Sequence, residues 1–416
     1  MADSNSSQTF VVIGGGQAGG RAVEGIRKAG FDGHVILLSE EERAPYERPP
    51  LSKEVLTGAA EPDSAALRTH DWYEDQKIDL RLSTRAGRID RARKRVVLQD
   101  GQELAYDRLL LATGAQPKVP DFPGVELAGV HVLRDVADCL AIRDAMRKGA
   151  RVALVGGGYI GLEVAAAARK LGCEATVLEA ASSLMRRQVA PELGDWYARL
   201  HRDHGADVRT EAEVSRLLGS THVEGVELAD GTRVDADLVV IGVGIQPNVE
   251  LALQAGLEVG DGIEVDDQGR TSDPDIFAAG DVTRHPNPYT NGKLRLESWQ
   301  NAQNQALVAG QTMAGVADVR HDDVPWFWSD QHGVNLQMVG MPSGQPRQVW
   351  RGDPEQGAGF TLFYLDDQGR LIGANAVDRP ADIAAARRMI ERGVNPDPDK
   401  LADPDVSMKK LLKGQA

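Results

Sequence analysis

Two glycine clusters in the sequence have the residue types and spacing of dinucleotide-binding turns. Residues 14–19 and residues 156–161 both read Gly-x-Gly-x-x-Gly. In such a turn the first glycine makes the tight bend, the second lets the backbone approach a pyrophosphate, and the third lets helix and strand pack closely. The N-terminus of the following helix then offers unpaired N–H groups and a partial positive charge to the phosphates. The sequence therefore predicts two sites for dinucleotides.

An acidic residue stands at the end of the next apolar run after each cluster, Glu40 in the first copy and Glu179 in the second. A carboxylate can accept hydrogen bonds from ribose hydroxyls but would repel a 2′-phosphate. Glu179 therefore favours NAD over NADP, although Arg186 and Arg187 leave some tolerance for the phosphorylated form. The alternative interpretation of Glu179 is a solvated residue at the end of a strand.

The elements that must position these residues can be read around both clusters. Residues 9–13 are an apolar strand before the first cluster, a helix is expected to about Ala29, and residues 34–38 are the next strand. The second cluster is set in the same order, from the strand at residues 151–155. Strands that alternate with helices predict parallel sheets covered on both faces. We therefore expect an α/β fold with two Rossmann-like dinucleotide-binding domains.

Proline-containing segments mark the expected domain boundaries, and the pattern of predicted elements changes in the C-terminal region. The chain is expected to leave the first domain near prolines 117, 120 and 123 and to return to it at residues 245–248. From about Pro325, residues 360–374 predict a hairpin and residues 380–392 an amphipathic helix. This last region predicts a small α+β domain at the C-terminus.

Composition and charge exclude several classes of function. The chain has 416 residues with a formal net charge of −15, which argues against binding to nucleic acid or to an anionic membrane. The first eight residues lack the features of a secretion signal, and no apolar run approaches the length of a membrane span. We therefore expect a soluble, cytoplasmic protein that has no transmembrane segment.

The cysteines and histidines predict no metal centre. The two cysteines, Cys139 and Cys173, are too few and too far apart for a disulfide scaffold or a four-ligand zinc site, and we expect both to be buried. The nine histidines lack metal-binding spacing, and His285 and His332 are expected to be ordinary loop residues. The basic cluster at residues 85–95 is expected to be a solvated face.

On these motifs the chain resembles the flavoprotein reductases that have two dinucleotide-binding domains. The resemblance implies that the first glycine cluster, residues 112–114 and the late Gly280-Asp281 pair bind FAD, and that the second cluster binds NAD. The implied domains are an FAD-binding domain of residues 1–115 and 245–325, an inserted NAD-binding domain of residues 116–244, and a C-terminal interface domain of residues 326–416.

Three segments resemble one branch of these reductases. Disulfide reductases carry a CxxxxC pair near the first long helix, and NADH peroxidases carry one cysteine there, whereas residues 40–60 contain none. Residues 43–53, 297–303 and 325–331 instead resemble the oxygenase-coupled, NADH-dependent ferredoxin reductases of the putidaredoxin reductase type.

This resemblance implies a function in electron transfer. NADH would pass hydride to FAD, and the electrons would leave one at a time to a 2Fe–2S ferredoxin that supplies a cytochrome P450 or a ring-hydroxylating oxygenase. Two alternatives stay open. One is a rubredoxin reductase, and the other is an NADH-sensing flavoprotein that resembles apoptosis-inducing factor.

The resemblance also assigns roles to individual residues. Lys53 would lie beside the flavin N5 edge, Glu163 near the nicotinamide, and Trp328 with Trp299 against the isoalloxazine ring, so Lys53, Glu163 and Trp328 are the catalytic candidates. The alternatives are a surface lysine, an exposed acid at a helix N-terminus and domain-interface core. Arg48 would bind FAD, or else form a salt bridge within its loop. The residues expected to hold the two cofactors are Gly14, Gly16, Ala18, Gly19, Glu40, Arg48, Lys53, Ala112, Thr113, Gly114, Asp281, Val282, Trp299, Trp328, Gly156, Gly158, Tyr159, Ile160, Gly161, Glu163, Glu179, Arg187 and Gly244.

Overall fold

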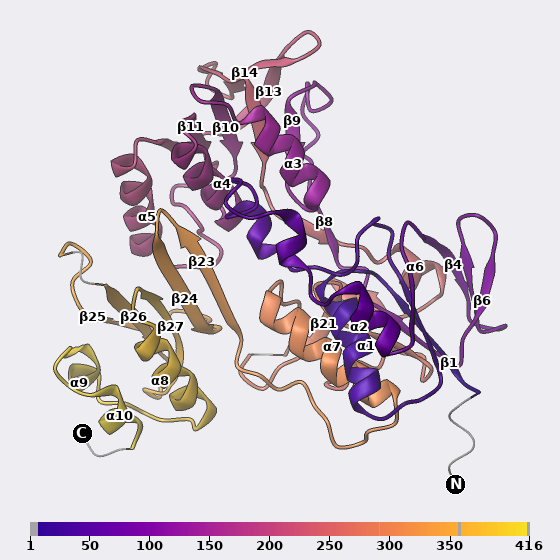
Figure 1. Ribbon diagram of the computed structural model, residues 1–416. Coiled ribbons are helices and arrows are strands. Elements are labelled where there is room, and N and C mark those ends of the chain that lie inside the picture. The colour runs from indigo at the N-terminus through magenta and orange to yellow at the C-terminus, as the bar shows by residue number, and fades with distance from the viewer. Residues whose placement is uncertain (1–6, 291, 357–358, 414–416) are drawn as a thin grey trace.

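The computed structural model describes residues 7–290, 292–356 and 359–413, which form three five-stranded sheets in different parts of the chain (Figure 1). The first sheet has the order β20-β7-β1-β2-β3 with all neighbours parallel, as the alternation of strands and helices predicts. Its strands are β1 (Thr9–Ile13), β2 (His34–Leu38), β3 (Ile78–Arg81), β7 (Arg108–Leu111) and β20 (Ile276–Ala278).

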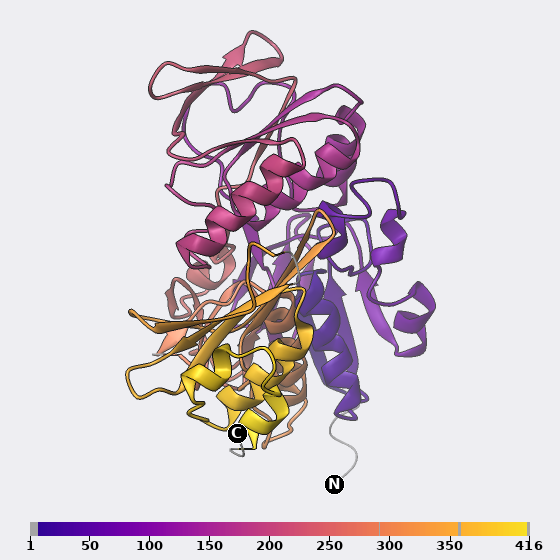
Figure 2. The same ribbon diagram turned by 90° about the vertical axis from the view of Figure 1, so that its left-hand side faces the viewer.

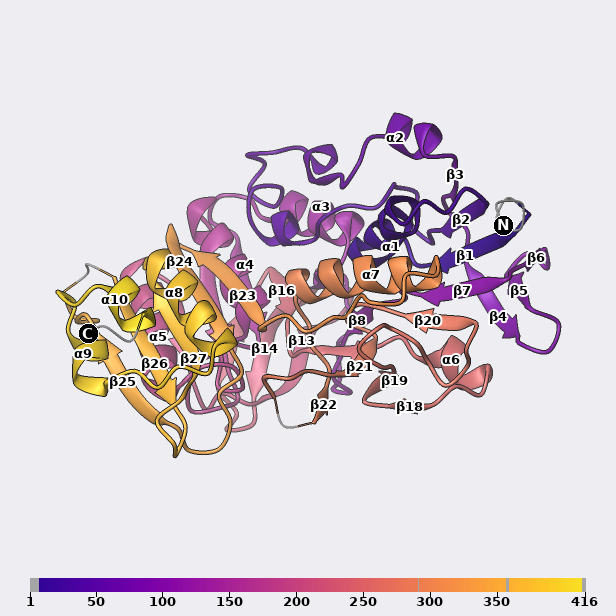
Figure 3. The ribbon, with the colours of Figure 1, turned by 90° about the horizontal axis from the view of Figure 1, so that it is seen from below.

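Helices α1 (Gln17–Lys28) and α7 (Trp299–Met313) lie side by side over one face of this sheet (Figure 3). Glycine permits their close approach. A Cβ on Gly25 would lie 2.5 Å from the carbonyl oxygen of Leu307, and one on Gly310 would lie 2.3 Å from that of Ala22. Because a side chain at either position would separate the helices, these glycines fix how α7 is placed against the first glycine turn.

The other face of the first sheet is covered by an antiparallel sheet of β4 (Ala86–Asp90), β5 (Arg95–Leu98) and β6 (Glu103–Ala105). The basic cluster lies on this small sheet. Its members are largely solvated and form ion pairs, such as Arg85 with Glu40 at 2.8 Å and Arg93 with Glu103 at 3.2 Å. The prediction of a solvated face is therefore confirmed, and acidic neighbours compensate much of its charge.

The second sheet repeats this design, with order β12-β11-β10-β16-β9 and parallel strands. A core of buried side chains joins it on one face to three helices, and the antiparallel β13-β14-β15 sheet covers the other face. The elements are β9 (Val130–Val132), α3 (Val136–Ala145), β10 (Arg151–Val155), α4 (Tyr159–Lys170), β11 (Glu174–Leu178), α5 (Pro191–Asp203), β12 (Asp207–Arg209), β13 (Val214–Gly219), β14 (Val223–Leu228), β15 (Arg233–Asp235) and β16 (Leu238–Ile241).

The two segments that connect the parallel sheets run next to each other. Strand β8 (Ala115–Pro117) pairs antiparallel with β17 (Ile245–Pro247). Beside this pair, the Thr113 hydroxyl donates to the Asn248 carbonyl at 2.7 Å, and the Asn248 side-chain amide donates to the Thr113 carbonyl at 2.8 Å. The segment that leads into the second sheet (residues 113–117) and the segment that leads out of it (residues 245–248) are thus hydrogen-bonded to each other beyond the end of β7.

The C-terminal sheet is antiparallel, with order β23-β24-β27-β26-β25. It contains the predicted hairpin, and the predicted helix follows as α8, so both predictions are confirmed. Figure 2 shows the three C-terminal helices on one face of this sheet, and the other face packs on α4 and α5. The elements are β23 (Trp326–Gln331), β24 (Val334–Gly340), β25 (Arg347–Arg351), β26 (Phe360–Leu365), β27 (Leu371–Val377), α8 (Pro380–Glu391), α9 (Pro398–Ala402) and α10 (Met408–Leu412).

The remaining elements are short and lie mostly near the first sheet. None of the helices in the described ranges combines the length and the apolar character that crossing a bilayer requires. These elements are the 3-10 turns at Pro49–Ser52 and Pro62–Ala65, α2 (His70–Asp75), α6 (Glu250–Gln254), β18 (Val259–Gly260), β19 (Gly262–Glu264), β21 (Thr283–Pro286) and β22 (Lys293–Leu294).

Cysteine burial is confirmed, whereas the prediction of a loop position is wrong for His285 and confirmed for His332. Cys139 and Cys173 are both free and buried in the core beside the second sheet. His285 is not a loop residue, because it lies fully buried in β21. His332 does lie in the turn between β23 and β24, but its ring stacks on His204 with centroids 4.1 Å apart. Both histidines contact residues distant in sequence, which local patterns do not reveal.

Candidate functional site

The first glycine cluster forms a strand-to-helix turn in which each glycine has a different reason to lack a side chain. A Cβ on Gly14 would lie 2.1 Å from the Ala112 carbonyl oxygen, and one on Gly19 would lie 1.7 Å from the Gly14 carbonyl oxygen. A Cβ on Gly16, in contrast, would meet only the Arg48 guanidinium, at 3.9 Å. The backbone at Gly16 therefore borders open space, where a ligand phosphate can approach it.

The second cluster has the same geometry. A Cβ on Gly156 would lie 2.6 Å from the Gly242 carbonyl oxygen, and one on Gly161 would lie 2.2 Å from the Gly156 carbonyl oxygen. A Cβ on Gly158 would have its nearest neighbour at 3.9 Å. The two turns thus match position by position, and each leaves its middle glycine open at the N-terminus of a helix.

A cleft of about 1160 Å³ extends from the first glycine turn to the beginning of α4. It brings together segments that lie far apart in the sequence, from the first parallel sheet, from helix α4 beside the second sheet and from β23. Of the predicted site residues, the cleft is lined by Gly14, Gly16, Ala18, Glu40, Arg48, Lys53, Ala112, Thr113, Gly114, Tyr159, Ile160, Glu163, Asp281, Trp299 and Trp328. The predicted residues outside its walls are Gly19, Val282, Gly156, Gly158, Gly161, Glu179, Arg187 and Gly244.

Arg48 faces the first glycine turn from within a polar network. It donates to the Glu41 carboxylate at 2.8 Å and to the Arg134 carbonyl at 2.6 Å. The Tyr46 hydroxyl also donates to Glu41, and burial raises the pKa of this tyrosine, so that it remains protonated. The loop salt bridge that was the alternative for Arg48 is therefore present, and it holds the guanidinium at the wall of the cleft.

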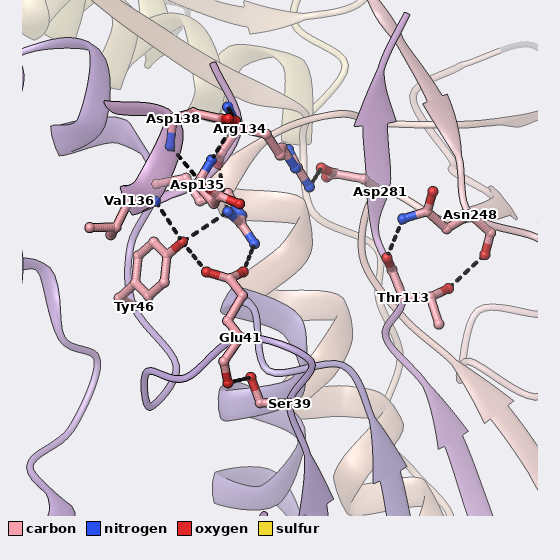
Figure 4. A network of polar contacts seen from close by, with 11 residues as sticks. Ser39, Glu41, Tyr46, Thr113, Arg134, Asp135, Val136, Asp138, Asn248 and Asp281 are labelled. Atoms are coloured by element: carbon pink, nitrogen blue, oxygen red, sulfur yellow. Dashed lines mark hydrogen bonds and ion pairs between the residues drawn. The ribbon is translucent and has the colours of Figure 1, made fainter. Parts of the chain in front are cut away.

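Arg134 is a cleft residue that the sequence motifs do not reveal. Its guanidinium lies 3.6 Å from the Asp281 carboxylate, across the end of the first sheet (Figure 4). Burial and the nearby charge of Arg48 both lower the pKa of Arg134, and burial raises the pKa of Asp281. Both guanidinium groups border the same cleft, where an anion between them would be stabilising. Arg134 precedes α3 and belongs to no recognisable motif, which is why sequence reasoning missed it.

Lys53 and Glu163 form an ion pair in the cleft, with 3.0 Å between Nζ and Oε2. The Ser52 hydroxyl donates to the same carboxylate oxygen at 2.5 Å, and the Ser329 hydroxyl donates to the other oxygen at 2.6 Å. Glu163 is only 5% exposed, so the interpretation as an exposed acid at a helix N-terminus is wrong. Its carboxylate joins the Pro49–Ser52 turn, helix α4 and strand β23.

Aromatic side chains close the cleft beside this ion pair. Trp328 packs edge to face on Trp299 with centroids 5.8 Å apart, and the Lys53 ammonium lies 5.9 Å from the Trp328 ring centre. The Nε1 atom of Trp299 is buried and has no hydrogen-bond partner among the described residues, and the same holds for the amide of Gln17. Buried donors at a cleft wall are favourable only when a ligand or water pairs with them. They fit a planar ligand that carries hydrogen-bond acceptors.

The second glycine turn is stabilised by Glu179 at the end of β11. The Glu179 carboxylate accepts hydrogen bonds from the backbone N–H groups of Gly157 and Ala181, both at 2.7 Å. The Arg187 guanidinium lies across the turn, 3.2 Å from where a Cβ of Gly244 would stand. Glu40, the acid predicted for the first copy, is exposed and pairs with Arg85. Glu179 directly follows β11, whereas Ser39 directly follows β2 and Glu40 comes one residue later, so the two acids do not occupy equivalent positions.

Known proteins resemble this chain in sequence and in fold over nearly its whole length. Residues 8–306 match the model of the pyridine nucleotide-disulphide oxidoreductase family, and residues 326–412 match a reductase C-terminal model. A ferredoxin–NAD(+) reductase component of the anthranilate 1,2-dioxygenase system of Burkholderia cepacia is 44% identical over 98% of this chain and 100% of its own length. Putidaredoxin reductase of Pseudomonas putida is 38% identical over 98% and 97%. The crystal structure of a covalent putidaredoxin reductase–putidaredoxin complex superposes with a TM-score of 0.95 at 37% identity, covering 99% of each chain.

Proposed function

Because this chain belongs to the pyridine nucleotide-disulphide oxidoreductase family, we propose that it is an FAD-dependent ferredoxin–NAD+ reductase that accepts electrons from NADH. Its electrons go to a 2Fe–2S ferredoxin, which supplies a cytochrome P450 or a ring-hydroxylating oxygenase. Relatives with these functions match nearly the full length of the chain.

The observation that carries the proposal is that the cleft contains no thiol. Reductases that act on disulfides need a reactive cysteine beside the flavin, but no cysteine lines the cleft in the described part of the chain. The two cysteines, Cys139 and Cys173, are buried beside the second sheet, and burial raises the pKa of both thiols. Electrons therefore have no thiol route out of the cleft, which supports transfer to an external carrier.

The residues around the first glycine turn fit FAD. The open backbone at Gly16 and the guanidinium groups of Arg48 and Arg134 suit a pyrophosphate, while the unpartnered Trp299 donor and the Trp328 ring suit the flavin. Bound FAD would supply the conversion between a two-electron hydride donor and a one-electron acceptor.

The second glycine turn suits NADH, with its pyrophosphate at Gly158 and its ribose at Glu179. Helix α4 begins at this turn and places Tyr159, Ile160 and Glu163 at the wall of the cleft. The nicotinamide would thus reach the flavin from the side of α4. There the Lys53–Glu163 pair orients the reacting rings, and Trp328 excludes water.

NADH-dependent reduction of cytochrome c by the purified protein, with and without 2Fe–2S ferredoxins from oxygenase systems, tests the proposal. A large ferredoxin-dependent increase is expected. If rubredoxin alone supports the reaction, the protein is a rubredoxin reductase. If no carrier increases the rate and NADH instead forms a long-lived complex with a changed oligomer size, the signalling alternative replaces the proposal.

A further inference from the structure

A chain of hydrogen bonds leads from the Glu163 carboxylate to a cluster of histidines at the far side of β23. The Ser329 hydroxyl lies 2.6 Å from Glu163 Oε1, and Gln331 Nε2 lies 3.1 Å from the Ser329 hydroxyl. Gln331 Oε1 lies 2.9 Å from His201 Nε2, and His201 Nδ1 lies 3.1 Å from His332 Nε2. The chain crosses from β23 to helix α5 and joins parts of the molecule that are distant in sequence.

The alternation of side chains along β23 explains why this chain is continuous. Residues 326 and 328 stack on each other on one face of the strand, and Trp328 also packs on Trp299 of α7. Residues 327, 329 and 331 point to the other face, where they meet Tyr159, Glu163 and His201. Ser329 and Gln331 thus lie on the face of β23 that packs against α4 and α5, whereas Trp328 lies on the opposite face and lines the cleft.

With neutral imidazole rings, one assignment of donors satisfies every contact. A carboxylate only accepts hydrogen bonds, so the Ser329 hydroxyl donates to Glu163 and accepts from the Gln331 amide. The Gln331 carbonyl then accepts from His201 Nε2–H, which leaves His201 Nδ1 to accept from His332. Every donor in the chain therefore points towards the carboxylate.

The chain is suited to hold the carboxylate and not to conduct protons. Ser329 is fully buried, Gln331 is 1% exposed and His201 is fully buried, so water does not compete for these groups. A carboxamide in the middle of the chain carries no proton on its oxygen, which interrupts proton transfer. Burial lowers the pKa of His201, which keeps the imidazole neutral and able to accept from His332.

We propose that Ser329, Gln331 and His201 are positioning residues that hold the Glu163 carboxylate against Lys53 during hydride transfer. This role rests on the proposed function, since it acts on NADH and FAD through Glu163. The Ser52 and Ser329 hydroxyls fix one carboxylate oxygen each, and only the Ser329 hydroxyl is itself held by a buried amide. Without the Gln331 amide donor, the Ser329 hydroxyl can rotate, and the Glu163 carboxylate oxygen that it binds is held less firmly.

The test compares Ser329→Ala and Gln331→Glu with two matched variants. Gln331→Glu keeps the size and the acceptor for His201 but removes the N–H donor. Ser329→Thr keeps the hydroxyl. Thr361→Ala is the control, because it removes a fully buried hydroxyl that donates at 3.0 Å to Asp382 elsewhere in the C-terminal sheet.

The first readout is the limiting rate of flavin reduction by NADH in stopped-flow experiments on the FAD-loaded protein. We expect this rate to fall about tenfold in Ser329→Ala and in Gln331→Glu while the Kd for NADH changes less than about twofold. Ser329→Thr should recover most of the rate, and Thr361→Ala should match the wild type. An equal fall in Thr361→Ala would overturn the proposal, because general loss of packing would then explain the effect.

The second readout does not depend on turnover. Infrared spectra of the protein without NADH identify the Glu163 carboxylate stretch as the band that disappears in Glu163→Gln. This band should shift in Ser329→Ala and Gln331→Glu and stay in place in Thr361→Ala. An unshifted band with an unchanged reduction rate in both folded variants would overturn the positioning role. Failure of the proposed function looks different, since NADH would then not reduce the wild-type flavin at all.

Discussion

Lys53 and Glu163 meet 3.0 Å apart in the cleft although they lie 110 positions apart in the sequence. Lys53 follows the Pro49–Ser52 turn, which packs against α3 and α4, and Glu163 lies on α4, the helix that begins at the second glycine turn. Their side chains are 17% and 4% exposed. The pair therefore joins the segment between β2 and β3 to helix α4 and sets the charge distribution in this part of the cleft.

The pairing of Lys53 with Glu163 predicts non-additive stability. Lys53→Met leaves a buried carboxylate without its cation, and removing one partner of such a pair costs about 3 kcal/mol. We expect a lower Tm by about 5 °C for Lys53→Met. The double variant Lys53→Met/Glu163→Gln should recover much of this loss, because no unpaired charge stays buried. Thermal unfolding at neutral pH measures both, and a double variant less stable than Lys53→Met would contradict the argument.

The position of Arg134 predicts an effect on FAD affinity. Its guanidinium lies in the cleft near Arg48, where it would contact the anionic part of the cofactor. Loss of a charge-assisted contact of this kind costs about 1.5–3 kcal/mol, so Arg134→Ala should raise the Kd for FAD about tenfold to a hundredfold. Arg143→Ala on α3, outside the cleft walls, serves as control. Titration of the apoprotein with FAD, followed by flavin fluorescence, measures both. An unchanged Kd in Arg134→Ala would place the pyrophosphate elsewhere.

Glu179 predicts the choice between the two nicotinamide dinucleotides. Its carboxylate is held at the second glycine turn by two backbone N–H groups and would repel a 2′-phosphate. Glu179→Arg should therefore weaken the preference for NADH over NADPH, by about tenfold in the ratio of kcat/KM values. Glu174→Gln, an exposed change at the start of the same strand, should leave the ratio as it is. A ratio that does not change in Glu179→Arg would remove the cofactor argument.

Local patterns predicted the elements that bind phosphates but not the contacts between distant segments. Each glycine turn is encoded within a few residues, because a strand, a tight bend and a helix N-terminus follow one another in the chain. The strands at residues 9–13 and 151–155 accordingly have the bounds that the sequence predicts. The antiparallel sheets that cover the outer faces were not predicted. Their strands are short, with weak alternation of apolar and polar residues.

The candidate site divides in the same way. Lys53 and Glu163 could be named as separate candidates, but their pairing depends on how the Pro49–Ser52 turn packs against α4, which no periodicity encodes. Arg134 has no motif, and its role appears only when its guanidinium is seen beside Asp281. The path from Ser329 to His201 depends on a strand from one part of the chain and a helix from another. Contacts of this kind become visible only in three dimensions.

Buried His285 predicts how stability changes with pH. The ring is fully buried, and burial, with a smaller contribution from neighbouring His321, lowers its pKa from 6.5 to about 3. Below about pH 6.5 the unfolded chain binds a proton at this histidine, whereas the folded protein does not bind one until the pH approaches 3. The contribution of His285 to the free energy of unfolding is therefore complete above pH 6.5 and declines as the pH falls towards 3. Between pH 8 and pH 5.5 the free energy of unfolding falls by about 1.4 kcal/mol because of His285.

The Tm of His285→Leu should therefore fall less than the Tm of the wild type between these two pH values. His70→Leu, at an exposed position, should behave as the wild type does. Thermal unfolding at the two pH values measures the difference, and an equal loss in His285→Leu and wild type would show that this histidine is not a source of acid sensitivity.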